Sequence, residues 1–92
     1  MIVGFRHKGL KRLFEKDDAS GIRPDLLHKV RTILAQLDEA ESIEDMRITS
    51  FHLHALKGNR KGLWSVMVNA NWRIVFSFSD GDARDVELID YH

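Results

Sequence analysis

The chain has 92 residues, 43% of them hydrophobic, and its 14 Lys and Arg residues are balanced by 14 Asp and Glu residues. This length predicts a single domain, residues 1–92, and the hydrophobic fraction is that of a folded rather than a disordered protein. The absence of cysteine excludes disulfides and thiolate metal sites, and no apolar stretch is long enough for a signal peptide or a membrane span. We therefore expect a cytoplasmic protein that does not bind membranes.

The first half of the chain predicts one short strand and then helices. Residues 2–5 suit a strand, and the helical spacing of Leu10, Leu13 and Phe14 predicts a helix from Lys8 to about Lys16. A polar break follows, and its Gly21 suits a helix exit. Pro24 then opens the main helix, because proline is favoured in a first turn. The apolar stripe of this helix consists of Leu26, Leu27, Val30, Ile33, Leu34 and Leu37.

After a capped turn predicted at residues 42–45, the second half predicts antiparallel strands. Residues 51–55 alternate, with His52 and His54 on one side. Residues 63–78 predict a hairpin with a core face and an opposite face of Ser65, Met67, Arg73, Val75 and Ser77. A tight Asp-Gly turn at 80–81 leads to the last strand. This order predicts an α+β domain, with two helices packed on a central antiparallel sheet whose other face is concave and basic.

A basic window lies inside the neutral chain. No Asp or Glu occurs between Asp45 and Asp80. The cations and histidines of this window are Arg47, His52, His54, Lys57, Arg60, Lys61 and Arg73. A local excess of positive charge is sufficient to bind a polyanion, so we favour a polyanion site over a chance clustering of solvated side chains.

Residues of the types needed for metal-free RNA cleavage lie in this window and at the chain end. The reaction needs a base for the proton of the attacking 2′-hydroxyl, cations beside the phosphoryl oxygens and an acid for the departing 5′-oxygen. Histidine serves as acid or base near neutral pH, and arginine and lysine bind phosphate oxygens. The candidates are His54, Lys57, Arg73, Asp90, Tyr91 and His92.

These candidates also have structural interpretations. His52 and His54 are spaced like two metal ligands, but two histidines make half of a site, and we expect no metal. Arg73, inside an apolar strand, pairs with Asp85 or Glu87 if its role is structural. From the residues alone, the sequence indicates a phosphate-binding α+β domain and leaves its activity open.

Six short segments, spread in order over nearly the whole chain, form a specific combination. They are residues 5–10, 53–58, 62–66, 71–76, 81–83 and 90–92. Together they resemble the HigB toxins, which belong to the RelE-like superfamily of bacterial toxin–antitoxin systems. One departure is Ala55, where many relatives have proline, but it removes no reactive group.

The resemblance implies a compact α+β fold and an mRNA endonuclease that cuts message in the decoding site of the translating ribosome. It also implies inhibition by a cognate HigA-type antitoxin with a helix-turn-helix, through which the pair represses its operator DNA. No cofactor is implied.

The resemblance further implies a role for each candidate. Lys57 and Arg73 stabilise phosphate charge, Asp90 orients a histidine, and Tyr91 positions the base or the sugar. Of the two proton carriers, we expect His92 to be the acid and His54 the base, because the terminal carboxylate beside His92 favours its charged form. Contacts to ribosomal RNA or flanking message are expected from Lys8, Lys11, Arg60 and Lys61.

The alternative function is a non-catalytic RNA- or ribosome-binding module, which shares the basic window but leaves the final Asp-Tyr-His unexplained. A domain that only binds another protein would leave His54 and Arg73 without a role. The spacing shows no helix-turn-helix, so we expect contact with DNA only through the antitoxin.

Overall fold

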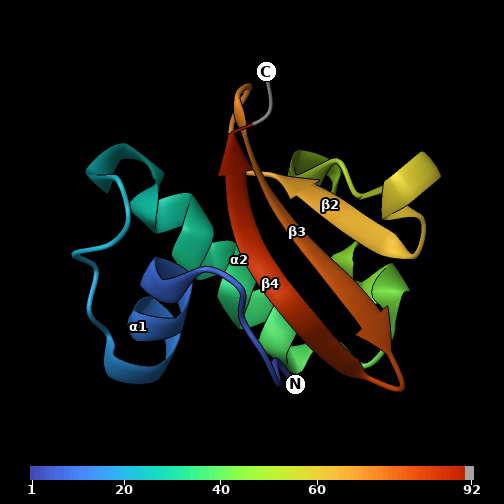
Figure 1. The fold of residues 1–92 in the computed structure, drawn as a ribbon, viewed down its shortest axis with the longest axis horizontal. Coiled ribbons are helices and arrows are strands. Elements are labelled where there is room, and N and C mark those ends of the chain that lie inside the picture. The colour runs from blue at the N-terminus through green and yellow to red at the C-terminus, as the bar shows by residue number, and fades with distance from the viewer. Residues whose placement is uncertain (91–92) are drawn as a thin grey trace.

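The computed structural model of the protein describes residues 1–90, in which a four-stranded antiparallel sheet packs against α-helices (Figure 1). The helices α1 (Lys8–Lys16) and α2 (Leu27–Glu39) come first in the chain. The strands β1 (His54–Ala55), β2 (Leu63–Met67), β3 (Trp72–Ser79) and β4 (Asp82–Asp90) follow and are neighbours in the sheet in this order. The predicted α+β class and antiparallel sheet are therefore confirmed. Within the described residues, no helix is long and apolar enough to cross a membrane.

The β2–β3 hairpin has the predicted faces. Trp64 pairs with Phe76 and Val66 with Ile74, and these residues belong to or pack against the core. Ser65 pairs with Val75 and Met67 with Arg73 on the opposite face, which we call the outer face. Residues that lie directly opposite each other in an antiparallel pair point to the same side, so the hairpin separates core from outer face along its length.

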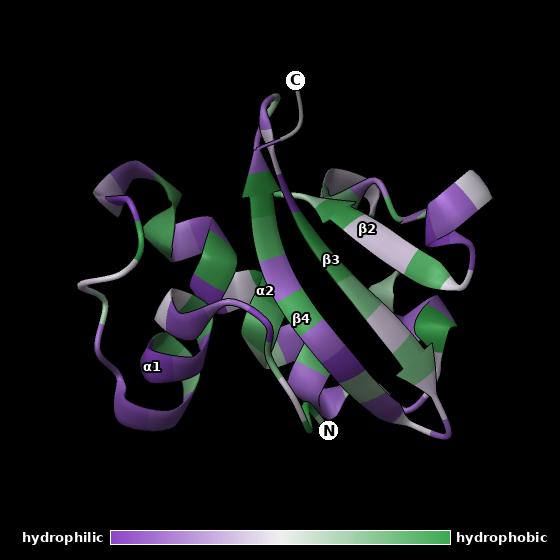
Figure 2. Ribbon diagram, in the orientation of Figure 1, coloured by the Kyte–Doolittle hydropathy of each residue, from purple (hydrophilic) through white to green (hydrophobic). Residues whose placement is uncertain are grey.

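β4 continues this pattern after the tight turn at Asp80 and Gly81, whose φ angles of 53° and 79° confirm the predicted two-residue connection. Hydrophobic and hydrophilic residues alternate over much of β4, except at residues 84–85 and 88–89 (Figure 2). A bulge near Asp85, which has a φ of 54°, shifts the register between β3 and β4.

Helix α1 has the predicted bounds and begins at His7, whose Nδ1 accepts a hydrogen bond from the Leu10 amide at 3.1 Å. It ends at Asp17, which adopts the left-handed conformation with a φ of 54°. Asp17, rather than the glycine at position 21, therefore supplies the left-handed residue at the helix end. Gly21 instead lies against Gly9, where an added Cβ would come within 2.7 Å of the Gly9 Cα.

Helix α2 follows a 3₁₀ turn, η1 (Pro24–Leu26), which begins at Pro24 as predicted. Its apolar stripe is buried and faces the sheet. The predicted capped turn is η2 (Ile43–Met46), in which Ser42 and Asp45 form a capping box. The core thus lies between the helices and one face of the sheet, and the outer face has no helix of α1 or α2 against it.

Two predicted strands differ from the structure. Residues 2–5 form only isolated parallel bridges to β4, from Ile2 to Ala83 and from Phe5 to Val86, because the bulge at Asp85 interrupts the edge between them. Residues 51–55 were predicted as an alternating segment, but the 3₁₀ turn η3 (Thr49–Phe51) and His52, with a φ of 47°, break it. Only the two residues of β1 pair with β2.

Candidate functional site

The outer face brings together residues from all four strands. His54 on β1 lies opposite Ser65 on β2, which lies opposite Val75 on β3 and, beyond it, Glu87 on β4. The next row consists of Met67, Arg73 and Ile89. Glu87 shares the face with Arg73, so the face is not uniformly positive, and its predicted basic character stays a prediction.

A hollow of about 220 Å³ opens on this face. We call it the outer hollow, and its lining residues are His52, His54, Ser65, Met67 and Arg73. Two residues predicted from distant parts of the sequence, His54 and Arg73, therefore line one cavity. An imidazole and a guanidinium around a cavity of this size provide a proton carrier beside an anion-binding group.

The backbone of the β2–β3 turn holds the Arg73 side chain in place. Its Nη1 donates hydrogen bonds to the carbonyl oxygens of Asn69 at 2.6 Å, Trp72 at 3.2 Å and Ala70 at 3.4 Å. The turn itself is fixed by the Asn69 side chain, whose Oδ1 accepts from the amides of Asn71 and Trp72, both at 2.9 Å. The guanidinium is therefore preorganised at the rim of the outer hollow.

The two carboxylates proposed as structural partners of Arg73 lie at different places on β4. Asp85 lies 3.9 Å from the guanidinium of Arg6. Glu87 lies opposite Val75 and Ile89 lies opposite Arg73, so Glu87 is a diagonal neighbour of Arg73 across β3 and β4.

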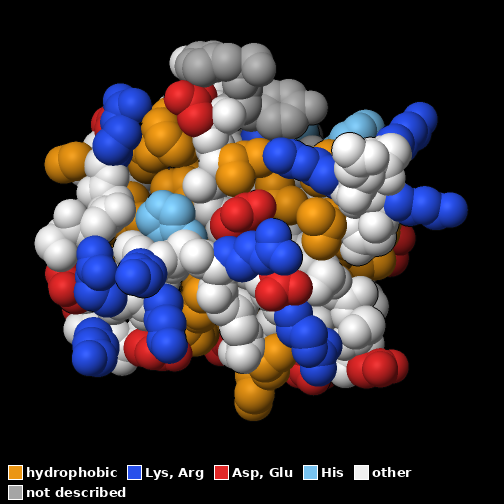
Figure 3. Space-filling view, viewed as in Figure 1, with side chains coloured by type: hydrophobic (Ala, Val, Ile, Leu, Met, Phe, Trp, Pro, Cys, Tyr) orange, Lys and Arg blue, Asp and Glu red, His pale blue; other side chains and the backbone are white. Residues whose placement is uncertain are grey.

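The loop between β1 and β2 carries the cations that follow His54 in the sequence. Lys57 and Lys61 line a separate hollow of about 340 Å³ together with Leu56 and Trp64, so Lys57 is not among the residues that line the outer hollow. Arg60 lies in the 3₁₀ turn η4 (Gly58–Arg60) of the same loop. Figure 3 shows Lys and Arg side chains projecting from the molecule in this region, before β2.

The predicted residues at the chain end are described only in part. Asp90 is exposed and lies opposite Trp72 on β3. Trp72 and Arg73 are consecutive strand residues that point to opposite faces of the sheet, so the register places Asp90 on the face opposite to that of Arg73. Tyr91 and His92 lie outside the described residues. Within residues 1–90, no group of three or more His, Asp or Glu side chains is arranged to hold a metal.

Lys8 and Lys11 are exposed on α1, whose Leu10 and Leu13 are part of the core. They therefore lie on the helical side of the sheet, away from the outer face. Positive side chains gather over the α1 side of the molecule in Figure 3.

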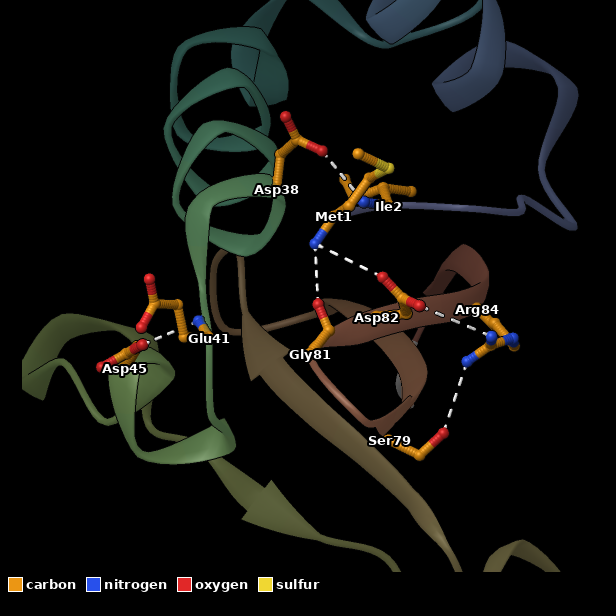
Figure 4. Close-up of polar contacts among 9 residues, drawn as sticks. All are labelled: Met1, Ile2, Asp38, Glu41, Asp45, Ser79, Gly81, Asp82 and Arg84. Atoms are coloured by element: carbon orange, nitrogen blue, oxygen red, sulfur yellow. Dashed lines mark hydrogen bonds and ion pairs between the residues drawn. The ribbon is translucent and has the colours of Figure 1, made fainter.

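A larger hollow of about 650 Å³ lies at the end of the sheet near the N-terminus. Its lining includes the carboxylates of Asp38, Glu39, Glu41, Asp80 and Asp82. Figure 4 shows part of its wall, where the Met1 amino group donates to the Gly81 carbonyl at 2.8 Å and lies 3.9 Å from the Asp82 carboxylate. Carboxylates repel phosphate, so the smaller outer hollow is the better candidate for an RNA site although this one is larger.

The alternation along the hairpin predicts that Ser65 and Met67 lie on the outer face, but no motif marks them as site residues. His52 also lines the hollow without having been predicted as a site residue. The spacing of Ser65 and Met67 carried a signal for the face, since they alternate with core residues. No pattern in the sequence indicates how close β1 brings His52 and His54 to Ser65, because β1 has only two residues.

Comparisons with known proteins agree with this fold. A family model described as "RelE-like toxin of type II toxin-antitoxin system HigB" matches residues 3–92. The Endoribonuclease HigB of Proteus vulgaris is 45% identical over 92 residues, which is 100% of both chains. Toxin HigB-1 of Vibrio cholerae is 31% identical over 90 residues, covering 96% of this chain and 95% of that protein.

A solved structure has the same fold. The heterotetrameric YoeB-YefM toxin-antitoxin complex of Staphylococcus aureus contains a chain that matches with a TM-score of 0.63 and 18% identity. The match covers 100% of this chain and 95% of that one. At this identity the likeness concerns the fold alone.

Proposed function

Because the chain belongs to the HigB-like family of RelE-like toxins of type II toxin–antitoxin systems, we propose that it is a metal-independent endoribonuclease. It cuts messenger RNA in the decoding site of the translating ribosome and so inhibits translation. The 45% identical relative from Proteus vulgaris is named an endoribonuclease, which supports the activity. The observation that carries the proposal is the outer hollow, where His54 and Arg73 line one cavity.

The proposed reaction is an internal transfer at one phosphodiester. The 2′-oxygen of the message attacks the adjacent phosphorus while His54 accepts its proton. The bond from phosphorus to the 5′-oxygen breaks, and His92 donates a proton to the leaving oxygen. The products are a 2′,3′-cyclic phosphate and a 5′-hydroxyl, so no water, metal or cofactor is consumed.

The remaining candidates stabilise charge or position the substrate. Arg73 binds the phosphoryl oxygens as negative charge grows on them, and its hydrogen bonds to the turn carbonyls support this role because they reduce the reorganisation required. Lys57 adds a second cation from the neighbouring loop. Asp90 orients a histidine, and Tyr91 positions the base or sugar. Outside the reacting centre, RNA is bound by Lys8, Lys11, Arg60 and Lys61.

The proposed protein partner is a HigA-type helix-turn-helix antitoxin, through which the toxin reaches operator DNA. The family description names a toxin–antitoxin system, and the YoeB-YefM neighbour is a toxin–antitoxin complex. Both support an antitoxin partner. Because the proposed substrate is message on the ribosome, the proposed site of action is the cytoplasm.

A programmed translation reaction tests the enzyme. Purified protein is added with and without ribosomes, and the ends of the message are mapped. We expect cuts only with ribosomes, with a cyclic phosphate on the upstream product. His54→Ala and Arg73→Ala should each lower the rate by about a hundredfold or more, the usual size of a general-base or charge-stabilising contribution.

The matched control is His28→Ala, because His28 is also an exposed histidine but lies on α2. It should cut message at the wild-type rate. A wild-type protein that stalls ribosomes and leaves message intact would instead establish the alternative, a non-catalytic ribosome-binding module. Full activity of His54→Ala would remove that residue from the mechanism.

A further inference from the structure

Ser65 is the only polar residue classed as buried among residues 1–90, with 5% of its surface exposed. It lies in the middle of β2 on the outer face and lines the outer hollow. Its burial does not come from the core, because the residues of the core cluster lie on the other face of the sheet. Val75, which lies opposite Ser65 on β3, is only 2% exposed and provides an apolar neighbour on that side.

The Ser65 hydroxyl makes no hydrogen bond within the described part of the chain. No wholly buried side-chain nitrogen or oxygen there lacks a partner, so the hydroxyl keeps its small exposed area at the hollow. Ser77 provides a contrast on β3, because its hydroxyl donates to the Arg84 carbonyl at 3.4 Å. The Ser65 hydroxyl is therefore open to a group in the hollow, whereas the Ser77 hydroxyl is used within the fold.

The neighbours of Ser65 indicate which kind of group would accept a hydrogen bond from its hydroxyl. His54 lies directly opposite on β1, and Arg73 lies one pair further along on β3, at the diagonal position. Diagonal neighbours across an antiparallel pair have Cα atoms about 7–8 Å apart, which leaves room for a phosphate between a serine and an arginine. A hydroxyl between a proton carrier and a guanidinium is placed to donate to the same anion that the guanidinium binds.

We propose that Ser65 is a substrate-contacting residue whose hydroxyl donates a hydrogen bond to a non-bridging oxygen of the phosphate held in the outer hollow. The role rests on the proposed endoribonuclease function. The hydroxyl forms no covalent bond and transfers no proton. It supplies a neutral donor beside Arg73, and the bound RNA supplies the partner that the folded protein lacks.

Ser65→Ala separates this role from a structural one. The cleavage rate in the programmed translation reaction should fall about tenfold, the size expected for one neutral hydrogen bond. The midpoint of thermal unfolding should stay the same, because the described part of the chain makes no hydrogen bond with the Ser65 hydroxyl that the substitution would break. Ser65→Thr, which keeps the hydroxyl, should restore most of the rate.

Ser77→Ala is the matched control and should show the reverse pattern, with a slightly lower unfolding midpoint and a wild-type cleavage rate. If Ser65→Ala cuts as fast as wild type, or loses activity only in proportion to a lower midpoint, the inference about Ser65 is wrong. If the wild-type protein cuts no message, the proposed function fails first. The two failures are therefore distinguishable.

Synthetic messages with sulfur in place of each non-bridging oxygen of the scissile phosphate test the identity of the contacted group. Sulfur is a weak acceptor, so the ratio of wild-type to Ser65→Ala rates should shrink toward one for one of the two stereoisomers. An unchanged ratio for both stereoisomers would overturn the assignment to phosphate.

Discussion

Arg73 illustrates how one residue satisfies both the fold and the site. Its side chain lies between Met67 and Ile89 in the sheet, where its aliphatic part covers apolar surface. Its Nη1 donates hydrogen bonds to backbone carbonyl oxygens at the turn, at 2.6 Å to Asn69 and 3.2 Å to Trp72. Carbonyl dipoles of the turn fix the position of the guanidinium without adding a formal negative charge beside it.

His7 makes the stability of α1 depend on pH. Burial lowers the pKa of His7, with a smaller opposing effect from Glu87 and a smaller lowering effect from Arg12. The neutral imidazole is also the form that accepts the hydrogen bond from the Leu10 amide. The folded state therefore favours neutral His7, and stability is lost as pH falls from the ordinary histidine pKa of about 6.5 toward the lowered value.

We expect the free energy of unfolding of wild type to fall more steeply between pH 7 and pH 5 than that of His7→Asn. Asparagine keeps an acceptor at the N-cap but does not titrate, whereas His7→Ala should lose about 1 kcal/mol at pH 7 because the cap is removed. Urea unfolding at several pH values measures both effects. Parallel pH profiles for wild type and His7→Asn would show that His7 does not contribute.

At the scale of elements, α1 is docked through a backbone contact between two glycines. A Cβ added to Gly9 would lie 2.6 Å from the Gly21 carbonyl oxygen and 2.9 Å from His7 Cε1. Backbone atoms cannot give way as a flexible side chain can. The usual benefit of replacing glycine by alanine in a helix, about 1 kcal/mol, is therefore reversed here.

Gly9→Ala should lower the free energy of unfolding by about 1–3 kcal/mol, the typical cost of overpacking. Gly4→Ala is the control, because its Cβ would meet only the Asp85 amide nitrogen at 3.9 Å. Urea unfolding of both variants measures the difference. A Gly9→Ala protein as stable as wild type would show that the backbone contact between Gly9 and Gly21 does not restrict the side chain at position 9.

The elements differ in how well the sequence predicted them. The hairpin of residues 63–78 and the stripe of α2 were predictable because their periods extend over many residues and tertiary contacts follow the same pattern. β1 and the N-terminal bridges were not, because each contains two paired positions and depends on a partner strand. The outer hollow was therefore predictable only in part. Arg73 lies on the predictable hairpin, whereas the position of His52 depends on its left-handed backbone conformation, which no periodicity in the sequence indicates.

At the scale of the whole molecule, the N-terminal segment ties the helical layer to the sheet. The Ile2 amide donates to the Asp38 carboxylate at 2.9 Å (Figure 4). The Val3 amide donates to the Ala83 carbonyl of β4, also at 2.9 Å. Asp38 lies in the last turn of α2, where a negative charge is unfavourable to the helix dipole. The hydrogen bond to Ile2 offsets that cost, so Asp38 serves the assembly of the layers rather than its own helix.

Asp38→Ala should therefore lower the free energy of unfolding by about 1.5–3 kcal/mol, the range for a hydrogen bond to a charged group. Amide exchange at Val3 should accelerate, because its pairing with Ala83 depends on the same segment. Asp38→Asn keeps an acceptor oxygen and should recover much of the loss. Glu39→Ala, an exposed acid in the same turn, should be neutral or slightly stabilising because it only relieves the helix dipole. Equal urea midpoints for Asp38→Ala and Glu39→Ala, with Val3 exchange unchanged in both, would mean that the segment is held by its strand contacts alone.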